Sequence, residues 1–230
     1  MVVFCKPYSW QEEQITDFMN KVIRFALVFI ICYGICLVLF QIRAVSVPFY
    51  AALKVLTTGS VSSSLPSADI SSQWKNREGG GSDIYIVYGN PVLIQAAKQE
   101  AKNSGQRYAT LPTKSLELHL FEMFIVPVLF LIGLYVATPM HWKPKLMNLC
   151  IAFAILIIYL LFKIILLSLF EISNARIGVY ELGDSAMQFL GKILGVFSLG
   201  LTITLAFVLW LIFGFRNSRL ADDFKFVTTK

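Results

Sequence analysis

Four long stretches of apolar residues divide the chain, and polar segments separate them. A helix that crosses a bilayer needs about 20 mostly apolar residues, because roughly 30 Å of hydrocarbon is covered at 1.5 Å per residue. Stretches of this length predict membrane-spanning helices over four ranges: residues 22–41, 118–138, 146–170 and 193–215. The pattern therefore predicts an all-α membrane protein, built as a four-transmembrane-helix bundle.

The polar segments between these stretches complete the predicted organisation. Residues 1–21 predict a cytoplasmic or interfacial helix, or else the first turns of a long first span. Residues 42–117 form the longest polar segment and are expected outside the cytoplasm. Residues 171–192 predict a short outer loop, and residues 216–230 predict a cytoplasmic tail.

The segment 42–117 contains weak signals for a small folded unit. Thr57–Asp83 is rich in Ser and Gly and predicts a loop, whereas Asp83–Tyr88 alternates like a strand. Val92–Asn103 has helical character, and Gln106–Leu111 predicts a second strand. We therefore expect a small extracytoplasmic α/β insertion between helices 1 and 2. It is too small to bury its own core, so it should lean on the membrane helices or on a partner.

Composition and charge agree with this organisation and orient it. Hydrophobic residues make up 57% of the chain and charged residues 15%, and much of the net charge of +6 lies beside the apolar stretches. Lys143 and Lys145 lie between the second and third stretches, whereas Arg176 is the only basic residue in the middle of the next loop. The positive-inside rule then predicts a multi-pass protein with both termini cytoplasmic, and a nucleic-acid surface is not indicated. A less favoured alternative is signal-peptide cleavage after Ala44-Val45-Ser46.

Ionisable residues within apolar stretches are the first candidates for function, because a charge at the bilayer centre costs at least about 2.5–3.5 kcal/mol. Lys163 lies near the outer end of the third stretch, and Glu122 lies at the outer start of the second. These two residues are predicted to pair or to line a polar pocket. The alternative is that each side chain extends separately to the headgroups.

A second group of polar residues is expected at the outer face: Glu117, His119 and Arg176. His119 and Glu122 are three residues apart and would share one face of a helix, but no further histidine completes a metal-ligand set. A polar girdle at the membrane interface is favoured over a metal site, and neither a metal nor a cofactor is predicted. No catalytic residue is assigned, because the chain lacks G-x-S-x-G, P-loop and G-x-G-x-x-G motifs.

Small residues at the start of the fourth stretch predict close helix packing. Gly191 and Gly195 form a G-x-x-x-G pattern, and Gly200 follows. The contact is expected either within the chain's own bundle or with another subunit.

Several short motifs suggest a family. Ala137-Thr138-Pro139, followed by Trp142-Lys143-Pro144-Lys145, and Asn174-Ala175-Arg176-Ile177 resemble motifs of the bacterial membrane proteins that accompany exosortases, enzymes that process and sort tagged envelope proteins. The enzyme itself would need an outward-facing cysteine before Arg176 and a histidine after it. Cys150 lies at the cytoplasmic end of its stretch, and both histidines precede Arg176, so the resemblance implies an associated protein rather than the enzyme.

Three classes of function follow. The favoured one is a non-catalytic accessory or assembly subunit of an envelope complex in the bacterial inner membrane, and the resemblance implies a link to protein sorting or export. Its partners would be the lipid bilayer and other membrane protein subunits. The alternatives are a transporter or permease-like component that uses Glu122 and Lys163, and a membrane enzyme of unrecognised type with its site at the outer face.

Overall fold

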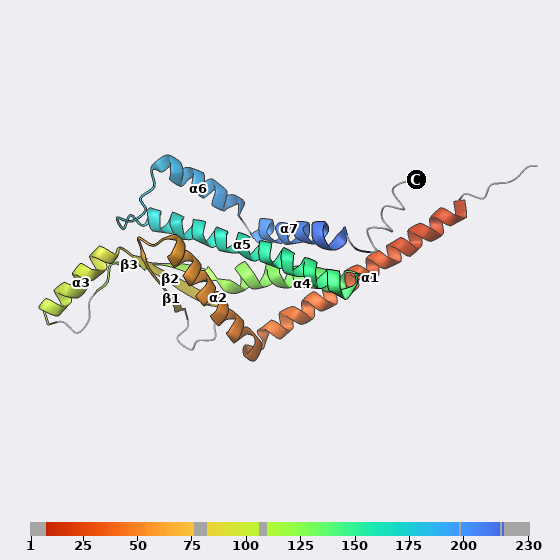
Figure 1. Cartoon of the computed structure of the whole chain (residues 1–230), viewed down its shortest axis with the longest axis horizontal. Coiled ribbons are helices and arrows are strands. Elements are labelled where there is room, and N and C mark those ends of the chain that lie inside the picture. The colour runs from red at the N-terminus through yellow and green to blue at the C-terminus, as the bar shows by residue number, and fades with distance from the viewer. Residues whose placement is uncertain (1–7, 76–81, 106–109, 198, 217, 219–230) are drawn as a thin grey trace, which may run out of the picture. The chain divides into compact units, whose positions relative to one another are not determined.

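The structure is a computed structural model that describes residues 8–75, 82–105, 110–197, 199–216 and 218 (Figure 1). Nearly all of the predicted tail at 216–230, and most of the predicted strand at Gln106–Leu111, lie outside the described residues. The chain divides into two compact units. One comprises residues 1–39, 127–156 and 203–230, and the other comprises residues 40–126 and 157–202.

Helices account for most of the described chain. In chain order they are α1 (Tyr8–Gln41), α2 (Arg43–Ser64), α3 (Pro91–Asn103), α4 (Val126–Ala137), α5 (Trp142–Asn174), α6 (Asp184–Val196) and α7 (Leu199–Leu209). Two π-helical segments adjoin them, η1 (Phe121–Ile125) before α4 and η2 (Trp210–Phe215) after α7. The three strands are β1 (Asp69–Trp74), β2 (Asp83–Gly89) and β3 (Thr113–His119).

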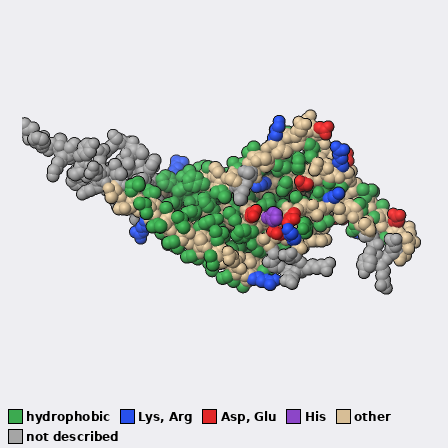
Figure 2. All heavy atoms as spheres, turned by 180° about the vertical axis from the view of Figure 1, so that it is seen from behind, with side chains coloured by type: hydrophobic (Ala, Val, Ile, Leu, Met, Phe, Trp, Pro, Cys, Tyr) green, Lys and Arg blue, Asp and Glu red, His purple; other side chains and the backbone are tan. Residues whose placement is uncertain are grey.

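Several helices have the length and apolarity that membrane insertion requires. Among the described residues, three qualify: Met19–Gln41 within α1, Arg43–Ser64 and Trp142–Asn174. A fourth is obtained if the bent pair Asp184–Val196 and Gly200–Phe215 forms one span. No residue from Met19 to Gln41 is fully buried within the chain, and Figure 2 shows a broad hydrophobic surface on one face. These exposed apolar helices fit a lipid environment, as the sequence predicted.

The second predicted span begins later than expected. Residues 113–119 form strand β3, and the apolar helix covers only Phe121–Ala137, which is 17 residues. In β3, Leu116 and Leu118 alternate with polar residues. Because they directly precede the apolar run of the next helix, the sequence alone does not separate the strand from that helix. The turn before Pro127 is π-helical, since a proline at this position cannot donate the regular backbone hydrogen bond.

Two predicted loops contain regular structure. The Ser-rich stretch Thr57–Asp83 continues α2 as far as Ser64 and then forms β1, because α2 buries Thr57 and Val61 and β1 pairs with β2. The predicted outer loop 171–192 contains the first turns of α6, whose amphipathic sequence buries Leu190. The predicted fourth span is therefore interrupted between α6 and α7.

Hydrogen bonds between buried side chains and backbone hold the first unit together. Trp210 Nε1 donates to Thr138 Oγ1 at 2.8 Å, and Asn148 Nδ2 donates to Phe213 O in η2 at 2.7 Å. Tyr135 Oη donates to Asn148 O at 3.2 Å. A single chain of contacts thus joins the end of α4, the start of α5 and η2.

The second unit contains a three-stranded antiparallel sheet in the order β1-β2-β3 (Figure 1). One face of the sheet is buried through alternate residues of the central strand and of β3: Ile84, Ile86, Tyr88 and Leu118. Helix α2 packs on this sheet, and Thr58 Oγ1 donates to Ser72 Oγ at 2.7 Å. Cross-strand pairing therefore gives the insertion two strands, β1 and β3, that the sequence did not predict.

Three hydrogen bonds attach this α/β unit to the end of α5 and to the connection that follows it. Tyr88 Oη donates to Glu171 O at 3.5 Å, and Asn90 Nδ2 donates to Ile177 O at 3.2 Å. The backbone N–H of Ser67 donates to Tyr180 Oη at 3.0 Å. The insertion thus makes contacts with the end of α5 and with residues 177–180, and whether it also leans on a partner stays a prediction.

Candidate functional site

The open face of the sheet carries a cluster of charged side chains at one end. Leu116, Leu118 and Leu120 point toward the buried face, so Glu117 and His119 lie together on the opposite face. Asp83 lies directly opposite His119 in the ladder, and Tyr85 lies opposite Glu117. The antiparallel register thus brings Asp83 to a pair of residues more than thirty positions later.

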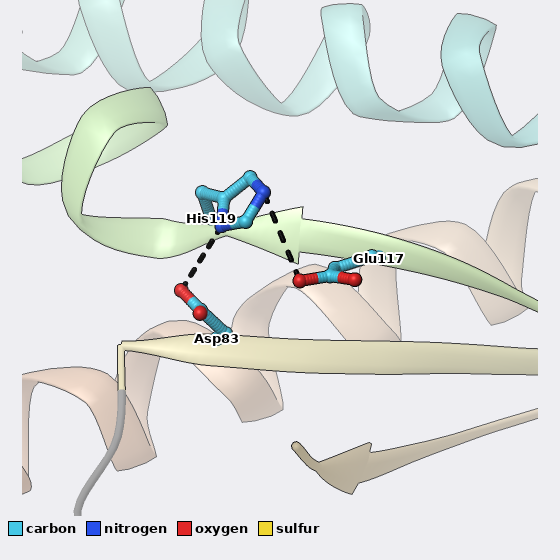
Figure 3. Close-up of side chains that lie close together, drawn as sticks. All are labelled: Asp83, Glu117 and His119. Carbon is cyan, nitrogen blue, oxygen red and sulfur yellow. Dashed lines mark hydrogen bonds and ion pairs between the residues drawn. The ribbon is translucent and has the colours of Figure 1, made fainter.

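The side chains of Asp83, Glu117 and His119 point toward one another (Figure 3). His119 Nδ1 lies 3.2 Å from Asp83 Oδ1, and His119 Nε2 lies 3.8 Å from Glu117 Oε1. One ligand atom from each residue can be chosen so that all three lie within 4.8 Å of one another. The side chains of Asp83 and Glu117 are 28% and 33% exposed, and that of His119 is 52% exposed.

Lys75 contributes a cation to the same cluster. Its backbone N–H donates to Asp83 O at 3.1 Å, which extends the ladder beyond β1. Its ammonium group donates a hydrogen bond to Glu117 and lies 3.9 Å from Asp83 Oδ2. The hydrogen bond that Lys75 donates to Glu117 holds the pKa of Lys75 above its ordinary value of 10.5. We refer to Lys75, Asp83, Glu117 and His119 as the charged cluster.

This arrangement has three chemical possibilities. The simplest is a charge network in which Lys75 pairs with two neighbouring carboxylates at the surface, where such pairs contribute about 0–1 kcal/mol. The second is a general base, because Asp83 can orient the His119 imidazole through Nδ1. The third is a metal site with three protein ligands and an open position. Within the described chain, the polar contacts of the His119 ring are to the two carboxylates alone.

Arg176 is not part of the charged cluster. It lies in the connection between α5 and α6, with a left-handed backbone conformation (φ 49°), and within the described residues it makes no ion pair with Glu117. It lines a polar pocket of about 360 Å³ that also contains Glu181 and Asp184. The predicted outer-face group is therefore divided, because Glu117 and His119 come together and Arg176 does not join them.

Glu122 and Lys163 form no ion pair with each other in the described part of the chain. Glu122 is exposed in η1, and it does not share a regular helix with His119, which lies in β3. Lys163 is partly exposed on α5. The predicted sharing of a helix face by His119 and Glu122 was wrong, because backbone pairing with β2 keeps residue 119 extended.

The predicted packing glycines lie in different surroundings. A Cβ at Gly191 would lie 3.6 Å from a ring atom of Phe170, whereas a Cβ at Gly195 would meet nothing within 4 Å. A neighbouring side chain comes closer at Gly133 of α4, where a Cβ would lie 3.2 Å from the Phe29 ring. Contact of Gly195 or Gly200 with another subunit stays a prediction.

Sequence reasoning missed Asp83 and Lys75 as members of the cluster. The alternation from Ser115 to Leu120 could have identified β3, and it would have placed Glu117 beside His119. The pairing of Asp83 with His119 depends on register, which no local sequence pattern specifies here.

Comparison of the chain with protein-family models, with curated proteins and with solved structures finds no match.

Proposed function

We propose that the chain is a non-catalytic integral membrane subunit that presents its α/β unit to a partner protein in a bacterial envelope complex for protein sorting or export. The main observation in support of this proposal is an apolar patch on the α/β unit. Val92 and Leu93 at the start of α3 are 71% and 48% exposed, and Leu111 before β3 is also exposed. Exposed apolar side chains that gather in one region are typical of sites that bind another protein.

The three patch residues gather at one end of the sheet. Gly89 at the end of β2 pairs with Thr113 at the start of β3, and a Cβ on Gly89 would lie 3.2 Å from Pro112 O. Val92 and Leu93 follow this end of β2, and Leu111 precedes this end of β3. The backbone therefore brings the three residues to the same end of the sheet.

A protein partner is favoured over direct lipid contact by position and by charge. The seven residues of β3 separate the patch from the apolar helix that begins at Phe121 by roughly 20 Å. Helix α3 also carries charges of both signs, Lys98, Glu100 and Lys102, whereas anionic lipid surfaces favour uniformly cationic helices. The hydrogen bonds of Tyr88 and Asn90 to the α5 end hold the unit in place for docking.

The proposal includes four spans with both termini in the cytoplasm. Although α2 has the length of a span, it packs on the polar sheet through Thr58 and Ser72, and Lys54 lies 4.9 Å from the Trp74 ring centroid. These contacts support a place for α2 outside the hydrocarbon. The spans would then be α1, the 17-residue helix Phe121–Ala137, α5, and the interrupted α6–α7 pair.

Purification in mild detergent tests the partner contact. The full-length protein should co-purify with defined subunits, and Leu93→Glu should abolish this without changing the thermal unfolding of the chain. Lys98→Glu, on the same helix but outside the patch, is the matched control and should retain the subunits. An unchanged subunit composition for Leu93→Glu, or a turnover activity in the isolated chain, would show that the proposal is wrong.

Membrane-impermeant thiol labelling tests the orientation separately. In a cysteine-free background, Lys98→Cys should react in intact cells, and Lys143→Cys should react only after permeabilisation. Reaction of both positions in intact cells would contradict the four-span arrangement.

A transporter or permease-like role is the second candidate, and buried polar groups on α5 favour it. Tyr159 Oη and Ser168 Oγ are buried and make no hydrogen bond within the described chain, and Lys163 lies between them in sequence. Tyr159 packs edge-to-face on Phe197, which follows the last turn of α6. Polar groups beside an interrupted helix are typical of transport sites. This role requires that Lys163→Leu abolish substrate movement in vesicles while leaving assembly intact.

A further inference from the structure

We propose that Asp83, Glu117 and His119 form a Zn²⁺ site, and that the Lys75 ammonium occupies the cation position when no metal is bound. The site lies on the open face of the sheet, at the opposite end from the apolar patch, and it is independent of the partner contact proposed above. It combines residues from β2 and β3 with a lysine that directly follows β1.

The ligand geometry is set by the backbone. Asp83 and His119 are paired residues, and Glu117 lies two residues before His119 on the same face. Tetrahedral zinc with bonds of about 2.0–2.2 Å separates its ligand atoms by roughly 3.3 Å. The distance of 3.2 Å between His119 Nδ1 and Asp83 Oδ1 matches this spacing. Small side-chain rotations of Glu117, which is a third exposed, would complete the set.

Lys75 supplies too little positive charge to balance the two carboxylates of the cluster. Two carboxylates face one ammonium group, which supplies one of the two positive charges needed to offset them. A divalent cation that displaces Lys75 would offset the charge of both carboxylates. Because the Lys75 side chain is 39% exposed, it can move into solvent without disturbing the ladder.

The ligand types favour zinc over other common divalent cations. Imidazole is a good ligand for zinc and a poor one for Ca²⁺ or Mg²⁺, which prefer six or more oxygen ligands. Three protein ligands leave one position open for water or for a partner side chain. A bound ion would join the start of β2 to the end of β3. The next residues, Ser82 and Leu120, are already joined, because the backbone N–H of Leu120 donates to Ser82 O at 2.9 Å.

Zinc titration of the purified full-length protein tests this site. Chelator-treated protein in mild detergent should bind about one equivalent of Zn²⁺, measured by calorimetry and by the visible absorption of Co²⁺ at the same site. Asp83→Asn and His119→Gln should each weaken binding by at least about tenfold. Glu122→Gln, a nearby exposed carboxylate outside the cluster, should bind as the unchanged chain does.

Lys75→Met separates a metal site from a charge network. If Lys75 competes with the ion, this variant should bind Zn²⁺ about tenfold more tightly, because a repelling unit charge has been removed. Thermal unfolding without metal checks that each variant is folded. Saturable binding that survives both Asp83→Asn and His119→Gln would place the metal elsewhere, and absence of saturable binding in Lys75→Met would overturn the proposal. Neither result would affect the partner contact, which is measured at Leu93.

Discussion

Trp210 Nε1 donates a hydrogen bond of 2.8 Å to Thr138 Oγ1, and both side chains are almost completely buried. Thr138 Oγ1 in turn donates to Leu134 O at 2.7 Å. The indole N–H is a donor only, so its partner has to be an acceptor. The hydroxyl of Thr138 thus serves both groups, and it lies in the Ala137-Thr138-Pro139 motif on which part of the family resemblance rests.

Replacing Thr138 by Val should destabilise the chain by about 1–2 kcal/mol, because the shape is kept while the buried Trp210 N–H loses its acceptor. Thr138→Ser retains the hydroxyl and should cost less. Thermal unfolding in a fixed detergent measures both variants. Equal unfolding temperatures for the Val and Ser variants would mean that this hydrogen bond contributes nothing measurable.

Asn90 makes two separable contacts, and its variants should separate them. Its Oδ1 accepts from Val92 N at 3.0 Å and caps α3, and its Nδ2 donates to Ile177 O. Asn90→Asp keeps the cap and loses the donor, whereas Asn90→Ala loses both and should cost about 0.5–2 kcal/mol for the cap alone.

Amide hydrogen exchange distinguishes the two contacts of Asn90. In Asn90→Asp, exchange should rise in residues 175–183 while α3 stays protected. In Asn90→Ala, exchange should rise in both segments. Unchanged protection of residues 175–183 in both variants would show that the Ile177 contact does not hold the unit on the α5 end.

Stability should fall at alkaline pH because of Tyr88. Burial, and then the negative charge of Glu171, raise the pKa of Tyr88 above its ordinary value of 10.0. Above pH 10 the unfolded chain loses the phenolic proton of Tyr88 more readily than the folded chain does. The contribution of Tyr88 to the free energy of unfolding is therefore fully present below pH 10, and it is lost as the pH rises through the pKa of the folded state.

The measurement is the unfolding temperature across this range. Tyr88→Phe should show a smaller decrease between about pH 9 and about pH 11 than the unchanged chain. Some decrease should remain, because the raised pKa of Lys75 acts in the same direction. Identical slopes for the two proteins would exclude Tyr88 as a source of the pH dependence.

The long helices and part of the insertion could be predicted from local pattern. The apolar lengths of α1 and α5 identify them without any tertiary information, and the alternation at Asp83–Tyr88 and the Asn90-Pro91 start identify β2 and α3. In these segments the local preference and the final environment agree, so a window of sequence is sufficient.

The rest of the sheet depends on pairing between distant residues. Strand β1 has the sequence Asp-Ile-Ser-Ser-Gln-Trp, whose serines favour a loop, and it is extended because each residue pairs with β2. Strand β3 shares its leucines with the apolar run that follows, so a window that averages hydropathy assigns it to the next helix. The charged cluster could not be predicted for the same two reasons, because Lys75, Asp83 and His119 come together only through the pairing of β1 and β3 with β2.

Glycine substitutions should separate packing within the chain from packing against another molecule. At Gly133, a Cβ would lie 3.2 Å from Phe29 Cε2 and 3.4 Å from Tyr33 Cβ, so Gly133→Leu should strongly destabilise the contact between α1 and α4. At Gly195 a Cβ meets nothing within 4 Å, so Gly195→Leu should leave the unfolding temperature of the chain unchanged. Size-exclusion chromatography in detergent then reports on assembly. A smaller complex for Gly195→Leu, with unfolding unchanged, would assign Gly195 to a subunit contact, whereas strong destabilisation by this variant would show that the space beside Gly195 is filled within the chain itself.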